Sequence, residues 1–188
     1  MTFAVGGAGA QTEIGLMLAQ SLKPAILDGR FRLVLVAGVN PLVERVFQAF
    51  ATRIGLGASL GDGVLVVRAE SKPEYFDRFD ALMRETDVLW TKPSELSFYS
   101  GLGIPIVMAP PLGSQERKNM RWLMDKGAAL PQYTPRLALE WLSDMMKDGV
   151  LAEKAFSGFV KTRRLGVYKI EEVIRTGTMT RETHPLKR

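Results

Sequence analysis

The sequence contains no cysteine and a single histidine, and each scarcity removes a class of chemistry. Without cysteine the chain can form neither a disulfide framework nor a thiolate site. The one histidine, His184, lies close to the C-terminus, where chains are usually mobile. Catalytic triads and metal sites that need histidine are therefore nearly excluded within this chain.

Long apolar runs are missing as well. No stretch approaches the roughly 20 apolar residues that a membrane-spanning helix needs. Ala8-Gly9-Ala10 superficially resembles a signal-cleavage site, but no basic residue precedes it and the apolar stretch before it is short and rich in glycine. We expect a cytoplasmic protein with at most peripheral membrane contact.

The sequence does contain enough apolar material for one well-packed domain. It has 188 residues, of which 46% are hydrophobic and 24% charged. At this length roughly 70% of the unfolded surface can be buried on folding, so a metal or disulfide scaffold is unnecessary. We expect a folded domain over residues 1–165, followed by a C-terminal helix and basic tail over residues 166–188.

The formal net charge of +5 is unevenly distributed. Basic and acidic side chains balance over residues 1–160, so the whole excess lies in residues 161–188. A nucleic-acid-binding domain would show a basic face of its own, with aromatic residues placed to stack on bases, and the sequence has no such stripe. We therefore expect no nucleic-acid partner.

Strand-like and helix-like segments alternate along the chain, which predicts an α/β domain with a parallel sheet. The predicted strands cover residues 2–5, 31–37, 64–67, 87–90 and 105–109. The predicted helices cover about 14–24, 42–54, 75–83, 114–126, 134–147, 150–164 and 168–175, with a short helix ending near 101–103. The expected fold is a Rossmann-like, doubly wound parallel sheet of five or six strands with extra C-terminal helices.

Three loops follow predicted strands at the edge where open parallel sheets bind ligands, namely residues 6–11, 91–97 and 110–116. In the first loop, Gly6, Gly7 and Gly9 let backbone N–H groups approach phosphate oxygens near a helix N-terminus. A tight strand-to-helix turn without any ligand is an equally open interpretation.

Two common phosphate-binding motifs are not matched. The dinucleotide fingerprint Gly-x-Gly-x-x-Gly, started at Gly7, would place its third glycine at Thr12. The second strand ends in Ala37-Gly38-Val39-Asn40, without an acidic residue for a ribose. No Gly-Lys-Ser/Thr ends the glycine run, as a nucleoside-triphosphate P-loop requires. A nicotinamide cofactor is therefore disfavoured.

The other two loops carry more specific motifs. One is Asp87-Val-Leu-Trp-Thr-Lys-Pro-Ser-Glu-Leu-Ser, and the other is Gly103-Ile-Pro-Ile-Val-Met-Ala-Pro-Pro-Leu-Gly-Ser-Gln-Glu-Arg-Lys-Asn, followed by Lys126-Gly-Ala-Ala. From residue 2 to about 145 the chain resembles the nucleotide-sugar-binding half of the family 28 glycosyltransferases, which have the GT-B fold. That family includes monogalactosyldiacylglycerol synthases and the transferase that adds N-acetylglucosamine to the lipid-linked peptidoglycan precursor. The resemblance implies a UDP-sugar as substrate, with no cofactor and no metal.

The resemblance also implies roles for particular residues. For the donor diphosphate it implies Gly6, Gly7, Gly9, Gln11, Ser94, Glu95, Leu96 and Ser97. For the nucleoside it implies Tyr75, Phe76, Phe79 and Phe98, and for the donor sugar Gln115, Glu116 and Asn119. Ordinary structure accounts for two of these groups as well: the aromatic residues as core, and the polar ones as a first helical turn capped by Ser114.

Two departures from the family pattern favour an alternative function. Pro93, Ser94 and Glu95 replace the glycines that follow Thr-Lys in the family, and Phe98 stands where the family has a Glu that binds the ribose. Losing a charge-assisted hydrogen bond to the ribose costs about 1.5–3 kcal/mol, roughly 10- to 150-fold in affinity. The alternative is a degenerate, non-catalytic binding or assembly domain. A sugar-nucleotide epimerase of related fold is disfavoured because its acid/base histidines have no counterpart here.

The catalytic base is expected from outside this sequence. In the family, the group that takes the proton from the acceptor hydroxyl belongs to an N-terminal domain that also binds the acceptor. This sequence begins at the first predicted strand of the donor domain, so we expect another domain or chain to supply the acceptor half, with a lipid as one candidate acceptor. Apolar residues of the C-terminal helices, such as Trp141, Phe156 and Phe159, are expected to pack in the core or against that half, with self-association as a further outlet.

Overall fold

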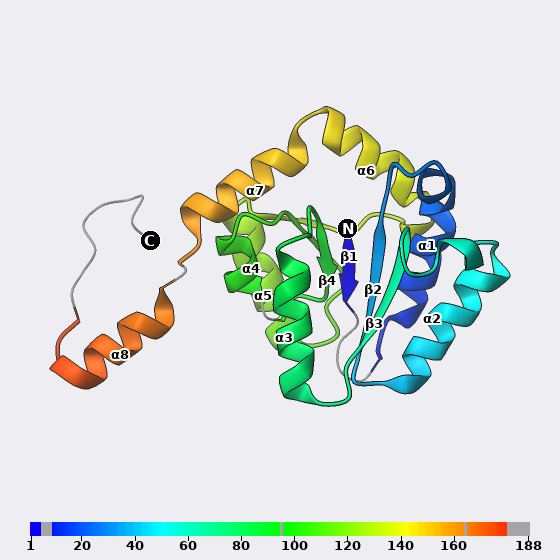
Figure 1. Cartoon of the computed structure of the whole chain (residues 1–188). Helices are drawn as coiled ribbons and strands as arrows, with labels where there is room; N and C mark the ends of the chain where they lie inside the picture. Colours follow the sequence, from blue (N-terminus) through cyan, green and yellow to red (C-terminus); the bar gives the residue numbers. More distant parts are fainter. Residues whose placement is uncertain (5–8, 95, 164, 180–188) are drawn as a thin grey trace.

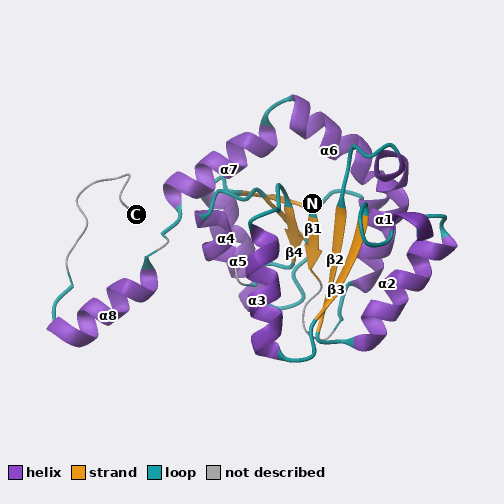
Figure 2. Cartoon of the chain, viewed as in Figure 1, coloured by secondary structure: helices purple, strands orange, loops and turns teal. Residues whose placement is uncertain are grey.

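The computed structural model describes residues 1–4, 9–94, 96–163 and 165–179. At its centre lies a sheet of six parallel strands in the order β3-β2-β1-β4-β5-β6 (Figures 1 and 2). The strands are β1 (Thr2–Ala4), β2 (Leu33–Gly38), β3 (Val64–Arg68), β4 (Leu89–Thr91), β5 (Ile106–Met108) and β6 (Ala129–Pro131). This order is that of a doubly wound Rossmann-like sheet, so the predicted fold class is confirmed.

Helices cover both faces of the sheet (Figure 1). One face is covered by α1 (Thr12–Leu27), α2 (Pro41–Arg53) and α6 (Ala138–Lys147), and the other by α3 (Lys72–Met83), α4 (Leu96–Gly101) and α5 (Ser114–Asp125). Helix α7 (Val150–Lys161) reaches from α6 to α4. Single 3-10 turns cover Gly57–Ser59 and Pro135–Leu137.

The core follows from the period of two along each strand. Phe3 and Trp90 point into the cluster beneath α1, α2 and α6, while their neighbours Ala4 and Leu89 point into the cluster beneath α3 and α4. Because both faces are covered, the central strands are apolar at successive positions instead of alternating with polar residues.

Two glycines allow unusually close helix packing. A Cβ atom at Gly15 of α1 would lie 2.8 Å from the ring of Phe47 and 2.9 Å from the ring of Phe3. A Cβ atom at Gly158 of α7 would lie 2.6 Å from Oγ and 2.7 Å from the carbonyl oxygen of Ser100. The second contact fixes α7 against α4, the helix that follows β4.

Two predicted helix ends are wrong, and packing explains both. Helix α1 does not end at Lys23-Pro24 but runs through the proline to Leu27, because Ala25 and Ile26 are buried in the core and offset the hydrogen bond that Pro24 cannot donate. Helix α7 ends at Lys161 instead of near residue 164. Thr162 is extended and fully buried, and its hydroxyl bonds to that of Ser100 at 3.0 Å.

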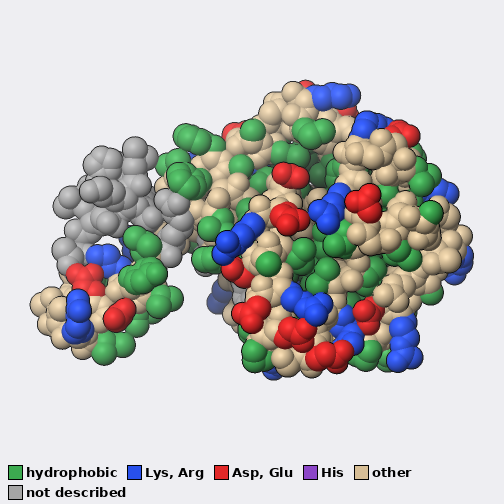
Figure 3. Space-filling model, in the orientation of Figure 1, with side chains coloured by type: hydrophobic (Ala, Val, Ile, Leu, Met, Phe, Trp, Pro, Cys, Tyr) green, Lys and Arg blue, Asp and Glu red, His purple; other side chains and the backbone are tan. Residues whose placement is uncertain are grey.

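Helix α8 (Gly166–Thr176) lies apart from the sheet and its covering helices (Figure 1). None of its residues is buried, and hydrophobic side chains gather on its surface (Figure 3), among them Val167, Tyr168, Ile170 and Ile174. The division of the chain at residue 165 stays a prediction. In the part of the chain that the structure describes, no helix has both the length and the apolar character to cross a membrane.

Candidate functional site

The predicted ligand edge is the row of loops that follow β1, β4 and β5. Ala4 pairs with Thr91, and Thr91 pairs with Met108, so the three strands end at the same level. Neighbouring strands lie about 4.8 Å apart, so their loops leave the sheet side by side. The strand order reverses between β1 and β4, where open α/β sheets form a ligand crevice.

The glycine loop after β1 is described in part. Gly6 and Gly7 lie outside the described residues. Gly9 has φ +71°, and a Cβ atom there would lie 2.7 Å from Cγ2 of Val43, so this position requires glycine. Gln11 is also left-handed, with φ 69°, and its Nε2 donates to the carbonyl oxygen of Pro110 at 2.7 Å. The first and third loops of the edge are thereby joined.

A partly buried ion pair joins the second loop to the third. Lys92 Nζ lies 3.2 Å from Glu116 Oε1, and the backbone N–H of Leu112 donates to Glu116 Oε2 at 2.8 Å. The side chains of Lys92 and Glu116 are 29% and 16% exposed. The bond from Leu112, with a smaller contribution from Lys92, outweighs partial burial and holds the pKa of Glu116 below its ordinary value. The carboxylate is therefore charged and fixed in place.

Sequence reasoning placed Lys92 in the predicted ligand loop of residues 91–97 but assigned no role to its side chain. The available signal was its position, since a cation that directly follows a strand at the ligand edge lies beside the neighbouring loops.

Asn119 holds the loop after β4 from the same helix, α5. Its Nδ2 donates to the carbonyl oxygens of Pro93 and Ser94, at 3.1 and 3.0 Å. Both amide protons are used in this way, which leaves Oδ1 as an acceptor. Gln115 is exposed and forms no side-chain hydrogen bond with the described residues. Position 119 follows 116 by three residues and 115 by four, so on the helix surface Asn119 is a neighbour of both.

The predicted diphosphate loop lies beside this cluster. Ser94 is exposed, and its backbone N–H donates to the carbonyl oxygen of Lys92 at 2.8 Å. Glu95 lies outside the described residues, and Leu96 and Ser97 begin α4. The donor role of this loop stays a prediction.

The predicted nucleoside residues form one aromatic chain that links α3 to α4. Ring centroids are 5.6 Å apart for Phe76 and Tyr75, 5.5 Å for Tyr75 and Phe79, 5.5 Å for Phe79 and Tyr99, and 5.6 Å for Tyr99 and Phe98. Phe79 is buried and Tyr75 half-buried, as expected for core residues. Phe76 and Phe98, at the two ends, are 57% and 49% exposed, so they alone of the five present wide ring surface to solvent. Tyr99 was not predicted.

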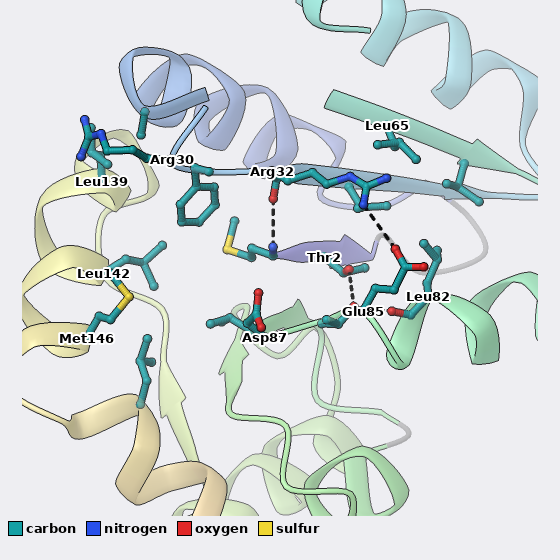
Figure 4. A pocket seen from close by; sticks show the side chains of 18 of the residues that line it. Thr2, Arg30, Arg32, Leu65, Leu82, Glu85, Asp87, Leu139, Leu142 and Met146 are labelled. Carbon is teal, nitrogen blue, oxygen red and sulfur yellow. Dashed lines mark hydrogen bonds and ion pairs between the residues drawn. The ribbon is translucent and has the colours of Figure 1, made fainter. Parts of the chain in front are cut away.

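A cavity of about 1020 Å³ opens at the opposite edge, where the strands begin (Figure 4). Side chains of Leu82, Leu142 and Met146 line it, and Arg32 pairs with Glu85 at its rim at 3.3 Å. Of the predicted site residues that the structure describes, none lines this cavity. The chemistry predicted from the sequence therefore lies at the other end of the strands.

Comparison with known proteins supports the glycosyltransferase resemblance at a coarse level. The chain is 27% identical over 125 residues to the processive diacylglycerol beta-glucosyltransferase of Bacillus subtilis (strain 168), an alignment that covers 65% of this chain and 30% of that protein. It is 30% identical over 126 residues to the protein of the same name from Bacillus pumilus (strain SAFR-032), again over 65% of this chain and 30% of the relative. The protein of that name from Bacillus licheniformis is 30% identical over 76 residues, which cover 39% of this chain and 20% of the relative.

The matched stretch thus spans less than a third of each of these relatives. A resemblance to glycosyltransferases is confirmed, whereas no particular member of the predicted family is. A further match, to the sequence model of a protein family, takes in residues 42–174, which include every described predicted site residue from Tyr75 to Asn119. Because this match covers well over half of the chain, the protein belongs to the family described as "Domain of unknown function (DUF6938)".

Proposed function

We propose that the chain is the donor-binding half of a glycosyltransferase, which binds a nucleoside diphosphate sugar, with UDP as the nucleotide. The observation that carries this proposal is the polar cluster of α5, whose Glu116 and Asn119 are bonded to the two loops after β4 and β5. The cluster stands beside the point where the strand order reverses, which is where open α/β sheets bind nucleotides.

The cluster suits a ligand that is rich in hydroxyl groups. A carboxylate has about four acceptor positions, of which Lys92 and Leu112 occupy two at Glu116. Asn119 Oδ1 is a further acceptor, and the exposed amide of Gln115 can donate or accept. Sugar hydroxyls donate readily to such acceptors, so we assign the donor sugar to this cluster.

The exposed ends of the aromatic chain suit the nucleoside. Phe76 and Phe98 are exposed to solvent, and each lies near the start of its helix, α3 or α4. Aromatic rings stack on planar ligands in offset or edge-on arrangements. A uracil base stacked on one of these rings would leave its diphosphate directed toward the loops after β1 and β4.

We assign acceptor binding and the catalytic base to a further domain or a partner chain. The names of the relatives support a lipid acceptor, and the 30% of their length that the alignments cover leaves room for such a half in those proteins.

Isothermal titration calorimetry with UDP and UDP-glucose tests the donor site, with ADP as the control nucleotide. We expect both uridine ligands to bind, and Gln115→Ala to weaken UDP-glucose more than UDP, because only the sugar contacts this side chain. Equal losses for the two ligands would show that the sugar lies elsewhere. Absence of heat at millimolar UDP and UDP-glucose, with the protein folded, would refute donor binding.

A non-catalytic binding or assembly domain is the second candidate, and Phe98 favours it. Its ring is 49% exposed at the position where the resembled family has a carboxylate for the ribose. Under this second function the polar cluster is retained for loop geometry alone, and calorimetry would detect no uridine nucleotide.

A further inference from the structure

The side chain of Glu116, in the first turn of α5, is held by contacts to both of its carboxylate oxygens. An exposed glutamate samples several rotamers, whereas both oxygens of Glu116 are fixed from two different loops. Lys92 comes from the loop after β4, 24 residues earlier in the chain, and the N–H of Leu112 comes from the loop after β5. The pair is partly buried, so solvent screens it less than an exposed ion pair.

We infer that Lys92 is a positioning residue, which orients the Glu116 carboxylate toward the hydroxyl groups of the donor sugar. This inference rests on the proposed function. The ammonium group fixes Oε1 while the N–H of Leu112 fixes Oε2, so the plane of the carboxylate is set before a ligand arrives. The remaining acceptor positions of the two oxygens then point away from both partners.

A competing role for Lys92 is direct binding of the diphosphate. The charge balance argues against it, since Glu116 already neutralises the ammonium and would repel a phosphate oxygen that approached along the same side. The two roles make different predictions. If Lys92 is a positioning residue, replacing it should weaken the binding of UDP-glucose and leave the binding of UDP unchanged. If Lys92 binds the diphosphate, replacing it should weaken the binding of both ligands equally.

The test uses three variants of the full chain: Lys92→Met, which keeps an unbranched side chain without the charge, Glu116→Gln, and Lys118→Met as a matched control. Lys118 is an exposed cation on α5, two residues from Glu116. Dissociation constants for UDP and UDP-glucose are measured by calorimetry at pH 7. We expect Lys92→Met and Glu116→Gln each to weaken UDP-glucose by about tenfold, the lower limit for losing one hydrogen bond to a charged group, and to change UDP by less than about twofold.

Lys118→Met should leave both constants unchanged. In the combined variant of Lys92→Met and Glu116→Gln, the loss should match that of Glu116→Gln alone, because the lysine acts only through the glutamate. Equal weakening of UDP and UDP-glucose by Lys92→Met would overturn the inference in favour of a phosphate contact, and so would additive losses in the combined variant.

A second measurement does not depend on ligand binding. The pKa of Glu116, followed by NMR of ¹³C-labelled glutamate carboxyls and assigned with Glu116→Gln, should rise in Lys92→Met and stay low in Lys118→Met. If wild-type protein bound neither nucleotide, the proposed function and the sugar role would both be overturned. In that event a raised pKa would still show that Lys92 holds the carboxylate, and an unchanged pKa would refute the pair itself.

Discussion

Replacing Gly158 by alanine should destabilise the whole domain through its contact with Ser100. The added Cβ would lie 2.6 Å from Oγ and 2.7 Å from the carbonyl oxygen of Ser100, so α7 or α4 has to move. Overpacking of this kind costs about 1–3 kcal/mol. Movement of Ser100 also stretches its 3.0 Å hydrogen bond to Thr162, and both residues are fully buried. A buried hydroxyl left without a partner costs about 1–3 kcal/mol more.

These costs are partly offset because alanine favours a helix over glycine by about 1 kcal/mol. The expected net loss in the free energy of unfolding is therefore about 3 kcal/mol. For a domain of this size the melting temperature changes by about 2–4 °C per kcal/mol, so we expect Tm to fall by about 6–12 °C. Urea unfolding followed by circular dichroism measures the free energy, and a thermal scan measures Tm.

Gly166→Ala provides the matched control, because it makes the same change at the first residue of α8, where a Cβ atom would meet nothing within 4 Å. The control should stay within about 0.5 kcal/mol of wild type. If Gly158→Ala were as stable as this control, the close approach of α7 to α4 would be wrong. Because α4 directly follows the loop after β4, faster amide hydrogen exchange over residues 98–102 should accompany the loss of stability.

Three further perturbations probe the site and the core beneath it. Folding lowers the pKa of Glu116, so this carboxylate adds stability that is present above its unfolded pKa and is lost as pH falls through its folded pKa. Glu116→Gln should therefore lower the free energy of unfolding near pH 7 by about 1–2 kcal/mol. The difference from wild type should shrink below pH 4. A difference that did not change with pH would contradict this linkage. Gln132→Ala should cost about 1–3 kcal/mol in urea unfolding, because it removes the acceptor of the fully buried Trp90 indole N–H, which lies 3.0 Å from Oε1; an unaltered midpoint would show that this bond contributes nothing. Gly9→Ala should be destabilising both through its φ of +71° and through the 2.7 Å contact with Val43, and thermal melting at wild-type values would rule out this loop geometry.

The sequence was most informative where apolar periodicity acts alone. The runs around Leu35 and Val107 predicted buried parallel strands, and glycine or proline after each strand predicted the loops of the ligand edge. Chain order and local pattern determine these features, so no knowledge of distant contacts was needed. Pro24 shows the opposite case, since local rules end the helix there while the burial of Ala25 and Ile26 continues it.

The contacts within the candidate site could not be predicted from spacing. Lys92 and Glu116 are separated in the chain by helix α4 and strand β5, and only the parallel crossover from β4 to β5 brings them to 3.2 Å. The same crossover places Asn119 against Pro93 and Ser94. Sequence motifs indicated which residues belong to the region, whereas the partners of each side chain depend on the register of neighbouring strands.

The hydrogen bonds that join the three edge loops have a consequence for the thermodynamics of ligand binding. Hydrogen bonds between Gln11 and Pro110, between Leu112 and Glu116, and between Asn119 and Ser94 hold the described residues of these loops together. At these bonded positions a ligand needs to immobilise little backbone, so its contacts there should carry a small entropic penalty. Under the proposed function, the specificity of this edge can then be altered at the exposed Gln115, without changing the side chains that hold the loops together.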